Sequence, residues 1–364
     1  MTLREKEILS MIKMNLMISQ QEIADNLGIT RSSVAVHISN LIKKGYIKGK
    51  GYVLNEGSYI TVIGGTNIDI QGFSSGNLRL NDSNPGEVKI SAGGVGRNIA
   101  ENLSRMGTNT KLISAFGDDL YGDKISNECR SAGIDIDNCL VLKNLSTSTY
   151  LSVLDETGDM KVAISDMDIV DYLNVDFIKT KAHLVENSAA IVIDANLSRD
   201  LIEYLLSNFK HKTFFIDTVS TAKAKKIKDL IGNFDTIKPN IYETEELTGI
   251  KIIEKKDLDK AADILLNKGV KRLFISLGGK GVFYSDESNR KYVNSPRINV
   301  INATGAGDAF MAGLAYSYTN DFNIDETISF SIHAARMALS HENTINPNIS
   351  AENILKIMRS EENA

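Results

Sequence analysis

Residues 302–310 read NATGAGDAF, and this stretch decides how we interpret the chain. Gly305, Ala306 and Gly307 form a turn whose backbone can approach a ligand closely, and Asp308 follows directly. An amphipathic helix is expected next, so the turn's N–H groups and the positive helix end face one small volume. Such a turn would stabilise a phosphoryl group during transfer, while Asp308 accepts the proton of the attacking hydroxyl. An ordinary glycine turn followed by an aspartate is the alternative.

Two further glycine-containing stretches place polar residues after predicted strands. In IGGTNIDIQG (63–72), Asn67 and Asp69 follow a buried strand, and a carboxylate there can hold two adjacent sugar hydroxyls. SAGGVGRNIAENL (91–103) leads through glycines into a helix with Asn98 in its first turn, without the spacing of a dinucleotide fingerprint or a phosphate loop. Taken alone, each stretch is also compatible with a local turn.

A fourth stretch, KPNIYETEEL (238–247), places Asn240 and Glu243 on one face of a predicted helix. This pair could organise water around Mg²⁺, because that cation keeps several waters and needs few protein ligands. Simple capping of the helix by Asn240 is the alternative.

Residues beyond 58 alternate strands with helices, which predicts an α/β fold with a mostly parallel sheet and helices on both faces. The stretch TSTYLSVLDETGDMKVAIS (147–165) breaks this alternation and predicts a hairpin that acts as a small β lid. We place the larger domain at 58–355, with lid segments at about 68–90 and 148–165.

The first 55 residues predict a separate winged helix-turn-helix domain. Ser19 and Glu22 form a capping box, Gly28 ends that helix and Thr30 caps the next one. The inner face of the third helix is expected to carry Val34, Ile38, Leu41 and Ile42. YIKGKGYVL (46–54) then predicts two short strands around a Gly-Lys-Gly turn.

In winged helix domains the second helix of the motif enters the DNA major groove. Its exposed face here would offer Arg31, Ser32, Ser33, His37 and Asn40 to bases, and Lys43, Lys44, Lys48 and Lys50 to phosphates. The alternative is a dimerisation or docking module with a solvated lysine-rich face.

Net charge distinguishes the two domains, and the cysteine content and hydropathy indicate the cellular compartment. Residues 1–55 carry eight Lys/Arg and four Asp/Glu, a net +4, whereas the remaining 33 basic and 42 acidic residues give −9. The two cysteines, Cys129 and Cys139, have no metal-binding spacing. No apolar run is long enough to span a membrane and no signal peptide is visible, so we expect a cytoplasmic protein.

In this order, GGVGRN (93–98), NIYE (240–243), SLGGKG (276–281) and ATGAGDAF (303–310) resemble the motifs of the ribokinase-like (PfkB) carbohydrate kinases over residues 58–355. The resemblance implies an ATP- and Mg²⁺-dependent kinase with Asp308 as base and residues 305–307 as anion hole. The implied sugar-binding residues are Asn67, Asp69, Gly93, Gly94 and Asn98. Around ATP and Mg²⁺ it implies Asn240, Glu243, Ser276, Gly278, Gly279, Gly281 and Thr304, with Asn343 or Asn346 near the adenine.

Within the family the chain looks most similar to pseudouridine kinases, on IGGTNIDIQGFS, SDMDI (165–169), DANLS (194–198) and NATGAGDAFMAGLAY. This implies phosphorylation of the 5′-hydroxyl of pseudouridine, with Asp166 and Met167 beside the base; the alternative for Asp166 is that it caps the turn. The open alternatives are another nucleoside or a sugar such as ribose or fructose, and a nucleoside-sensing transcription regulator. Asn302 replaces the family's usual aspartate, which leaves activation by a monovalent cation open, and lid pairing in relatives implies a homodimer.

Overall fold

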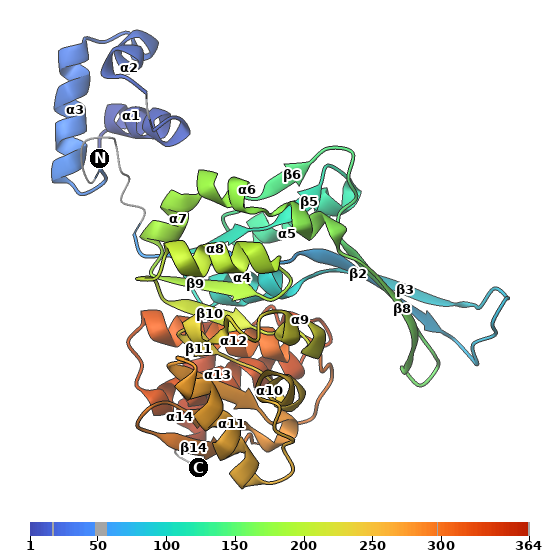
Figure 1. Ribbon diagram of the computed structural model, residues 1–364. Coiled ribbons are helices and arrows are strands. Elements are labelled where there is room, and N and C mark those ends of the chain that lie inside the picture. Colours follow the sequence, from blue (N-terminus) through green and yellow to red (C-terminus); the bar gives the residue numbers. More distant parts are fainter. Residues whose placement is uncertain (17, 48–56, 297, 363–364) are drawn as a thin grey trace. The chain divides into compact units, whose positions relative to one another are not determined.

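The computed structural model describes residues 1–16, 18–47, 57–296 and 298–362 (Figure 1). The chain divides into two compact units, Met1–Ser58 and Tyr59–Ala364. Each unit has its own apolar core, and we describe the two separately.

The first unit contains three helices, α1 (Leu3–Met14), α2 (Gln20–Leu27) and α3 (Arg31–Lys43). The predicted caps are confirmed, since Ser19 and Glu22 cap α2 reciprocally, Gly28 ends it at φ +62°, and the Thr30 hydroxyl caps α3. The inward placement of Ile42 was wrong, because this side chain is exposed while its neighbour Leu41 is buried. The predicted strands of the wing, with Lys48 and Lys50, lie largely outside the described residues.

The second unit is built on a twisted sheet whose first six strands in space run parallel, as the α/β pattern predicts. Two antiparallel strands, β13 and β14, extend it at one edge. In spatial order the strands are β4 (Thr110–Ile113), β1 (Ile60–Ile63), β9 (Ala190–Asp194), β10 (Phe214–Asp217), β11 (Thr236–Ile237), β12 (Arg272–Ser276), β13 (Val282–Ser285) and β14 (Arg290–Val293).

Helices cover both faces of this sheet, and side chains that alternate along the strands supply two apolar cores. In β1, for example, Val62 belongs to one core and Ile63 to the other. One face is covered by α4 (Val95–Arg105), α5 (Leu120–Ser131), α12 (Ala306–Thr319), α13 (Ile324–Leu339) and α14 (Ala351–Glu362). The other is covered by α6 (Val175–Thr180), α7 (Ala182–Asn187), α8 (Arg199–Asn208), α9 (Thr221–Lys226), α10 (Ile241–Thr248) and α11 (Lys255–Asn267).

A second sheet of four strands projects away from the main one and forms the lid (Figure 1). Its order is β3 (Gly86–Gly93), β2 (Asn67–Ser74), β7 (Thr149–Leu154) and β8 (Met160–Asp166). Residues 155–159 join the last two strands, which confirms the hairpin predicted around residues 156–159. The register places Asp69, Tyr150 and Ser165 side by side on one lid face. The opposite face carries exposed apolar residues, among them Val88, Ile90, Val162 and Ile164.

Short elements complete the second unit: the parallel pair β5 (Ala115–Gly117) and β6 (Leu140–Leu142), and the 3₁₀ turns η1 (Asp168–Tyr172), η2 (Ile231–Asn233) and η3 (Gly278–Lys280). Within the described ranges, no helix is both long and apolar enough to cross a membrane.

Candidate active site

The glycine turn of residues 305–307 opens helix α12, as the sequence predicts. Gly305 has φ +81°, and a Cβ atom built on it would lie 2.3 Å from the carbonyl oxygen of Thr344. Only glycine fits this position, because both the backbone angle and the space exclude a side chain. The first N–H groups of a helix have no acceptor within the helix, so this turn presents donors and a positive dipole end to a bound anion.

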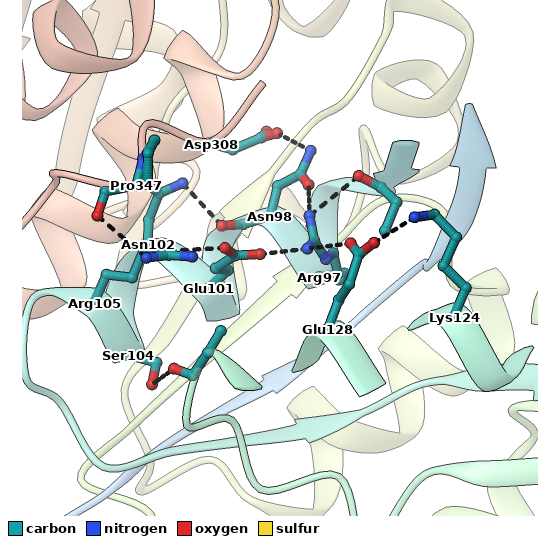
Figure 2. Close-up of polar contacts among 12 residues, drawn as sticks. Arg97, Asn98, Glu101, Asn102, Ser104, Arg105, Lys124, Glu128, Asp308 and Pro347 are labelled. Atoms are coloured by element: carbon teal, nitrogen blue, oxygen red, sulfur yellow. Dashed lines mark hydrogen bonds and ion pairs between the residues drawn. The ribbon is translucent and has the colours of Figure 1, made fainter. Parts of the chain in front are cut away.

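Asp308 lies in the first turn of α12 and contacts a residue that is 210 positions earlier in the chain (Figure 2). Its Oδ2 accepts a hydrogen bond of 2.9 Å from Nδ2 of Asn98 on α4. Burial of the carboxyl, together with the negative charge of Asp217, raises the pKa of Asp308 to about 8. A carboxylate with a pKa near neutrality is suited to take up a proton during a reaction.

The predicted sugar-contacting residues lie together at the base of the lid. Asn67 Nδ2 donates to Asp69 Oδ1 at 2.6 Å, and a Cβ atom on Gly93 would lie 2.2 Å from Asp69 Oδ2. Gly93 therefore leaves the space in which the Asp69 carboxylate rests. Gly94 has φ +98° and caps α4, where a Cβ atom would lie 2.5 Å from the Gly65 carbonyl oxygen.

A lysine and an aspartate next to these residues were not predicted from the sequence. Lys238 follows β11, is buried, and places its Nζ 3.1 Å from Asp217 Oδ2 at the end of β10. A Cβ atom on Gly307 would lie 3.3 Å from the same Nζ, so the ammonium group stands beside the glycine turn. Burial opposes the charge of Lys238, but the carboxylates of Asp217 and Glu243 outweigh it and raise its pKa. The available signal was a lysine two residues before the predicted helix cap Asn240.

The backbone after Asp217 is strained in a way that holds this carboxylate in place. Val219 has φ +63°, which is a rare conformation for a β-branched residue. Its N–H donates to Asp217 Oδ1 at 2.8 Å, so one oxygen of Asp217 is fixed by the turn while the other faces Lys238. Strain of this kind persists where the surrounding structure fixes the conformation, often at functional sites.

Asn240 and Glu243 form a reciprocal cap on α10, the capping arrangement that the sequence left open. Glu243 Oε1 accepts from Asn240 Nδ2 at 2.8 Å, and Oε2 accepts from Thr218 Oγ1 at 2.6 Å. Because both carboxylate oxygens already accept hydrogen bonds, Glu243 fits Mg²⁺ better through bound water than by direct contact. Among the described residues, no cluster of three or more His, Cys, Asp or Glu side chains is arranged as a metal site.

A cavity of about 650 Å³ opens on the other side of the glycine turn. Its lining includes Ala306 and Gly307 at the start of α12 and an apolar wall that contains Ile298, Val300 and Leu339. An apolar wall beside donors for anions suits a purine nucleotide. The predicted nucleotide-side residues that line it are Asn240, Ser276, Gly278, Gly279 and Gly281.

The profile of the pfkB family carbohydrate kinases matches residues 58–351, which covers the glycine turn, the cap on α10 and the lid. The chain belongs to this family. Kinases of the family use ATP and Mg²⁺, and the chain is accordingly a carbohydrate or nucleoside kinase. Residues 1–48 match a winged helix-turn-helix DNA-binding profile.

Two proteins of Escherichia coli K12 are similar to this PfkB kinase. The uncharacterized sugar kinase YeiI is 36% identical over 98% of both chains. The pseudouridine kinase is 39% identical over 85% of this chain and 99% of its own length. A crystal structure of a candidate sugar kinase from Clostridium perfringens shares the ribokinase-like fold, with a TM-score of 0.77 and 41% identity over 84% of this chain and 96% of that one.

Two residues expected near the nucleotide lie elsewhere in this PfkB kinase. Neither Thr304 nor Asn343 lines the cavity. Thr304 donates its N–H to Asn302 Oδ1 at 2.9 Å, and Asn302 Nδ2 donates to the Glu342 carbonyl at 2.9 Å. Asn343 is exposed and its N–H meets His341 Nδ1. The alternative, Asn346, is buried and its amide bonds the Met337 carbonyl, a contact within the fold.

The structure does not bring the two expected base-contacting residues to the sugar side of the lid. Asp166 pairs with Thr149, one position beyond the Tyr150–Ser165 pair, and therefore points to the face opposite Asp69. Met167 is half-buried and packs against the apolar core beneath α6 to α11. A change of one residue in strand register moves a side chain to the other face of the sheet. The sequence pattern alone does not establish this register.

In the first unit, Arg31, Ser32 and Ser33 are exposed at the start of α3, as DNA contact would require. His37 is half-buried, and its Nδ1 atom is enclosed without a hydrogen-bond partner. Lys44, expected to meet phosphates, instead bonds the buried Glu5 carboxylate at 2.8 Å.

Proposed function

We propose that this kinase transfers the γ-phosphoryl group of ATP to the 5′-hydroxyl of pseudouridine, giving pseudouridine 5′-phosphate and ADP. The observation that carries the proposal is the position of Asp308. Asp308 bonds Asn98 of α4, the helix that begins just after Gly93 beside Asp69, and it follows the glycine turn that borders the nucleotide cavity. A hydroxyl bound on the lid side would meet the base and the phosphoryl donor at one point.

The chemistry follows from these positions. Asp308 removes the proton of the 5′-hydroxyl while the 5′-oxygen of the substrate forms a bond to the γ-phosphorus. The bond from that phosphorus to the β–γ bridging oxygen breaks. ADP leaves with the electron pair, and Asp308 holds the proton. The N–H groups of residues 305–307 and the Lys238 ammonium face the phosphoryl oxygens, whose charge they stabilise.

We place Mg²⁺ beside Asp217 and Glu243, through water rather than by direct ligation. The described residues fit such a site, because Glu243 has both oxygens engaged and Asp217 is held by Val219 and Lys238. Bound there, the cation would neutralise charge on the phosphates of the nucleotide. Lys238 and the glycine turn supply the remaining positive potential.

The choice of pseudouridine over a free sugar rests on sequence similarity to the pseudouridine kinase and on the lid. Tyr150 and Ser165 share the face of Asp69, so the lid carries a ring and a hydroxyl beside the sugar residues. A ring can stack on a pyrimidine base and a hydroxyl can bond its edge. These two residues replace Asp166 and Met167 in our proposal for the base pocket.

The test is turnover by the purified protein with ATP and Mg²⁺ against pseudouridine, uridine, ribose and fructose, measured as ADP release and confirmed by chromatography of the product. Turnover confined to pseudouridine supports the proposal. Turnover on uridine or a free sugar instead keeps Asp308 and its anion hole but rejects the substrate. Absence of turnover with intact ATP binding favours a regulator that senses a nucleoside.

The second candidate role, DNA binding, is favoured by the winged helix profile and the exposed start of α3. We propose that Arg31, Ser32 and Ser33 face the major groove, with pseudouridine altering the affinity. Fluorescence anisotropy with the DNA upstream of the protein's own coding region tests this, and Arg31→Glu should weaken binding. Affinity equal to that for random DNA of the same length would reject it.

Two finer proposals concern the second unit. We propose a homodimer through the exposed apolar lid face of Val88, Ile90, Val162 and Ile164, which sedimentation velocity would detect. We also propose that no monovalent cation is needed. The Asn302 amide already links the Thr304 N–H to the Glu342 carbonyl across the loops that flank the glycine turn.

A further inference from the structure

A buried arginine that the proposed chemistry does not use lies directly behind Asn98 (Figure 2). Arg97 Nη1 donates to the Asn98 Oδ1 atom at 3.2 Å and to the Ala92 carbonyl of lid strand β3 at 3.1 Å. Its Nη2 faces two carboxylates, Glu101 in an ion pair and Glu128 at 3.4 Å. The guanidinium thus stands between the lid, helix α5 and the residue that bonds Asp308.

We propose that Arg97 is a positioning residue that determines which end of the Asn98 side-chain amide faces Asp308. The inference rests on the proposed role of Asp308 as base. An asparagine amide has an acceptor end and a donor end of nearly equal size. If the amide turned over, its oxygen would face the carboxylate of Asp308, and the hydrogen bond would become a repulsion.

The chemistry of the guanidinium supports this role. Arginine carries donors only, so the amide atom beside Arg97 must be the oxygen. The NH₂ end of Asn98 is then left for Asp308, which it meets at 2.9 Å. A glutamine or a water in place of Arg97 can donate or accept, and would not select one orientation. The Glu101 and Glu128 carboxylates hold the guanidinium in place for this contact.

The orientation of the amide matters because few positive groups face the base. Asp308 is faced by Asp217 of β10 and Asp194 of β9, which disfavour its ionised form, and by Lys238, which favours it. The Asn98 hydrogen bond is the other contact that favours the ionised form. Losing it would leave fewer active sites with an ionised base at neutral pH.

The test compares variants with balanced buried charge. Arg97→Gln is combined with Glu101→Gln and measured against Glu101→Gln alone, each with and without Asn98→Ala. The first readout is the ¹³C titration of the Asp308 carboxyl by NMR, assigned by its absence in Asp308→Asn. This readout needs no turnover, so it stands if the protein phosphorylates a different acceptor. The second is kcat for whichever acceptor the wild type turns over.

We expect Arg97→Gln to raise the apparent pKa of Asp308 by about one pH unit and to lower kcat about tenfold or more. In the Asn98→Ala background the same change should have no further effect, because the two residues act as one unit. Arg105→Gln is the matched control. It breaks the 2.8 Å pair with Glu101 without touching Asn98 and should leave the Asp308 titration unchanged.

Three results would overturn the inference: an unchanged Asp308 titration in the Arg97 variant, a full shift that persists without the Asn98 amide, or an equal shift in Arg105→Gln. If the charge-balanced pair fails to fold, Arg97→Met with Glu101→Leu replaces the ion pair by apolar side chains of similar size, and the same comparisons apply.

Discussion

Replacing Asp308 by asparagine is expected to abolish phosphoryl transfer and, at the same time, to stabilise the folded protein at neutral pH. The amide keeps the shape of the carboxyl and can still accept the hydrogen bond from Asn98. It cannot take a proton from the substrate hydroxyl, so turnover should fall by about a thousandfold or more. The gain in stability follows from the ionisation that the substitution removes.

The sign and size of this gain come from the shift at Asp308. Its pKa rises from an ordinary value of 3.8 to about 8 in the folded protein. Between these two values the unfolded chain loses the proton while the folded chain keeps it, so the wild type loses stability as pH rises from about 4 to 8. Full linkage would be about 1.4 kcal/mol per pH unit. Because Asp308 is partly open to solvent, we expect about 2 kcal/mol at pH 8, or a rise in Tm of about 5 °C.

The assay is thermal unfolding of the wild type and Asp308→Asn at pH 5, 6, 7 and 8, beside turnover at each pH. Asp137→Asn, a substitution of an exposed carboxylate, is the control for removing one negative charge. A Tm difference that does not grow from pH 5 to pH 8, or a variant less stable than the wild type at pH 8, would refute the reasoning about burial. Near-normal turnover would remove Asp308 as the base.

Four further predictions test other parts of the site. For the wild type, kcat/KM should fall tenfold per pH unit below an apparent pKa near 8, which is the pKa of Asp308 in the enzyme without substrate. Product chromatography across pH 5.5–9.5 would measure this. Lys238→Met should lower kcat/KM for ATP by about a hundredfold and leave KM for the acceptor within a few-fold, with Lys238→Arg as control. Asn302→Asp should introduce activation by K⁺ over tetramethylammonium in steady-state assays. Gly93→Ala should raise KM for the acceptor about tenfold or more. The added Cβ atom would lie 2.2 Å from Asp69 Oδ2 and would therefore displace this carboxylate. An unchanged KM would contradict the sugar site.

Local patterns carried most of what the sequence could predict. The capping box of Ser19, the glycine that ends α2 and the hairpin turn over 155–159 depend on neighbours in the chain, and the structure confirms them. The alternation of strands and helices was sufficient to predict the parallel sheet, because a chain with this pattern has few other ways to bury its apolar strands and helices.

Contacts between distant segments were not predictable in the same way. Lys238 gains its role only when β10 and β11 pair and bring Asp217 beside it. Nothing in the sequence distinguishes Arg97 from other helix residues. Its role depends on contacts with the Ala92 carbonyl of β3 and with Glu128 of α5. The sequence predicts Asp166 beside the base, but its pairing with Thr149 places it on the lid face opposite Asp69.

The separate lid sheet has a consequence for how this chain can diversify. Nearly all contacts assigned to the acceptor come from two continuous pieces, 67–98 and 149–166, whereas the donor cavity draws on residues after 237. Changes to the first set can therefore alter which alcohol is admitted while the phosphoryl-transfer half stays as it is. Exchanging the two pieces with those of a relative that acts on another nucleoside should transplant preference as a unit, so the lid is the place where evolution, or an engineer, can retune this enzyme without rebuilding it.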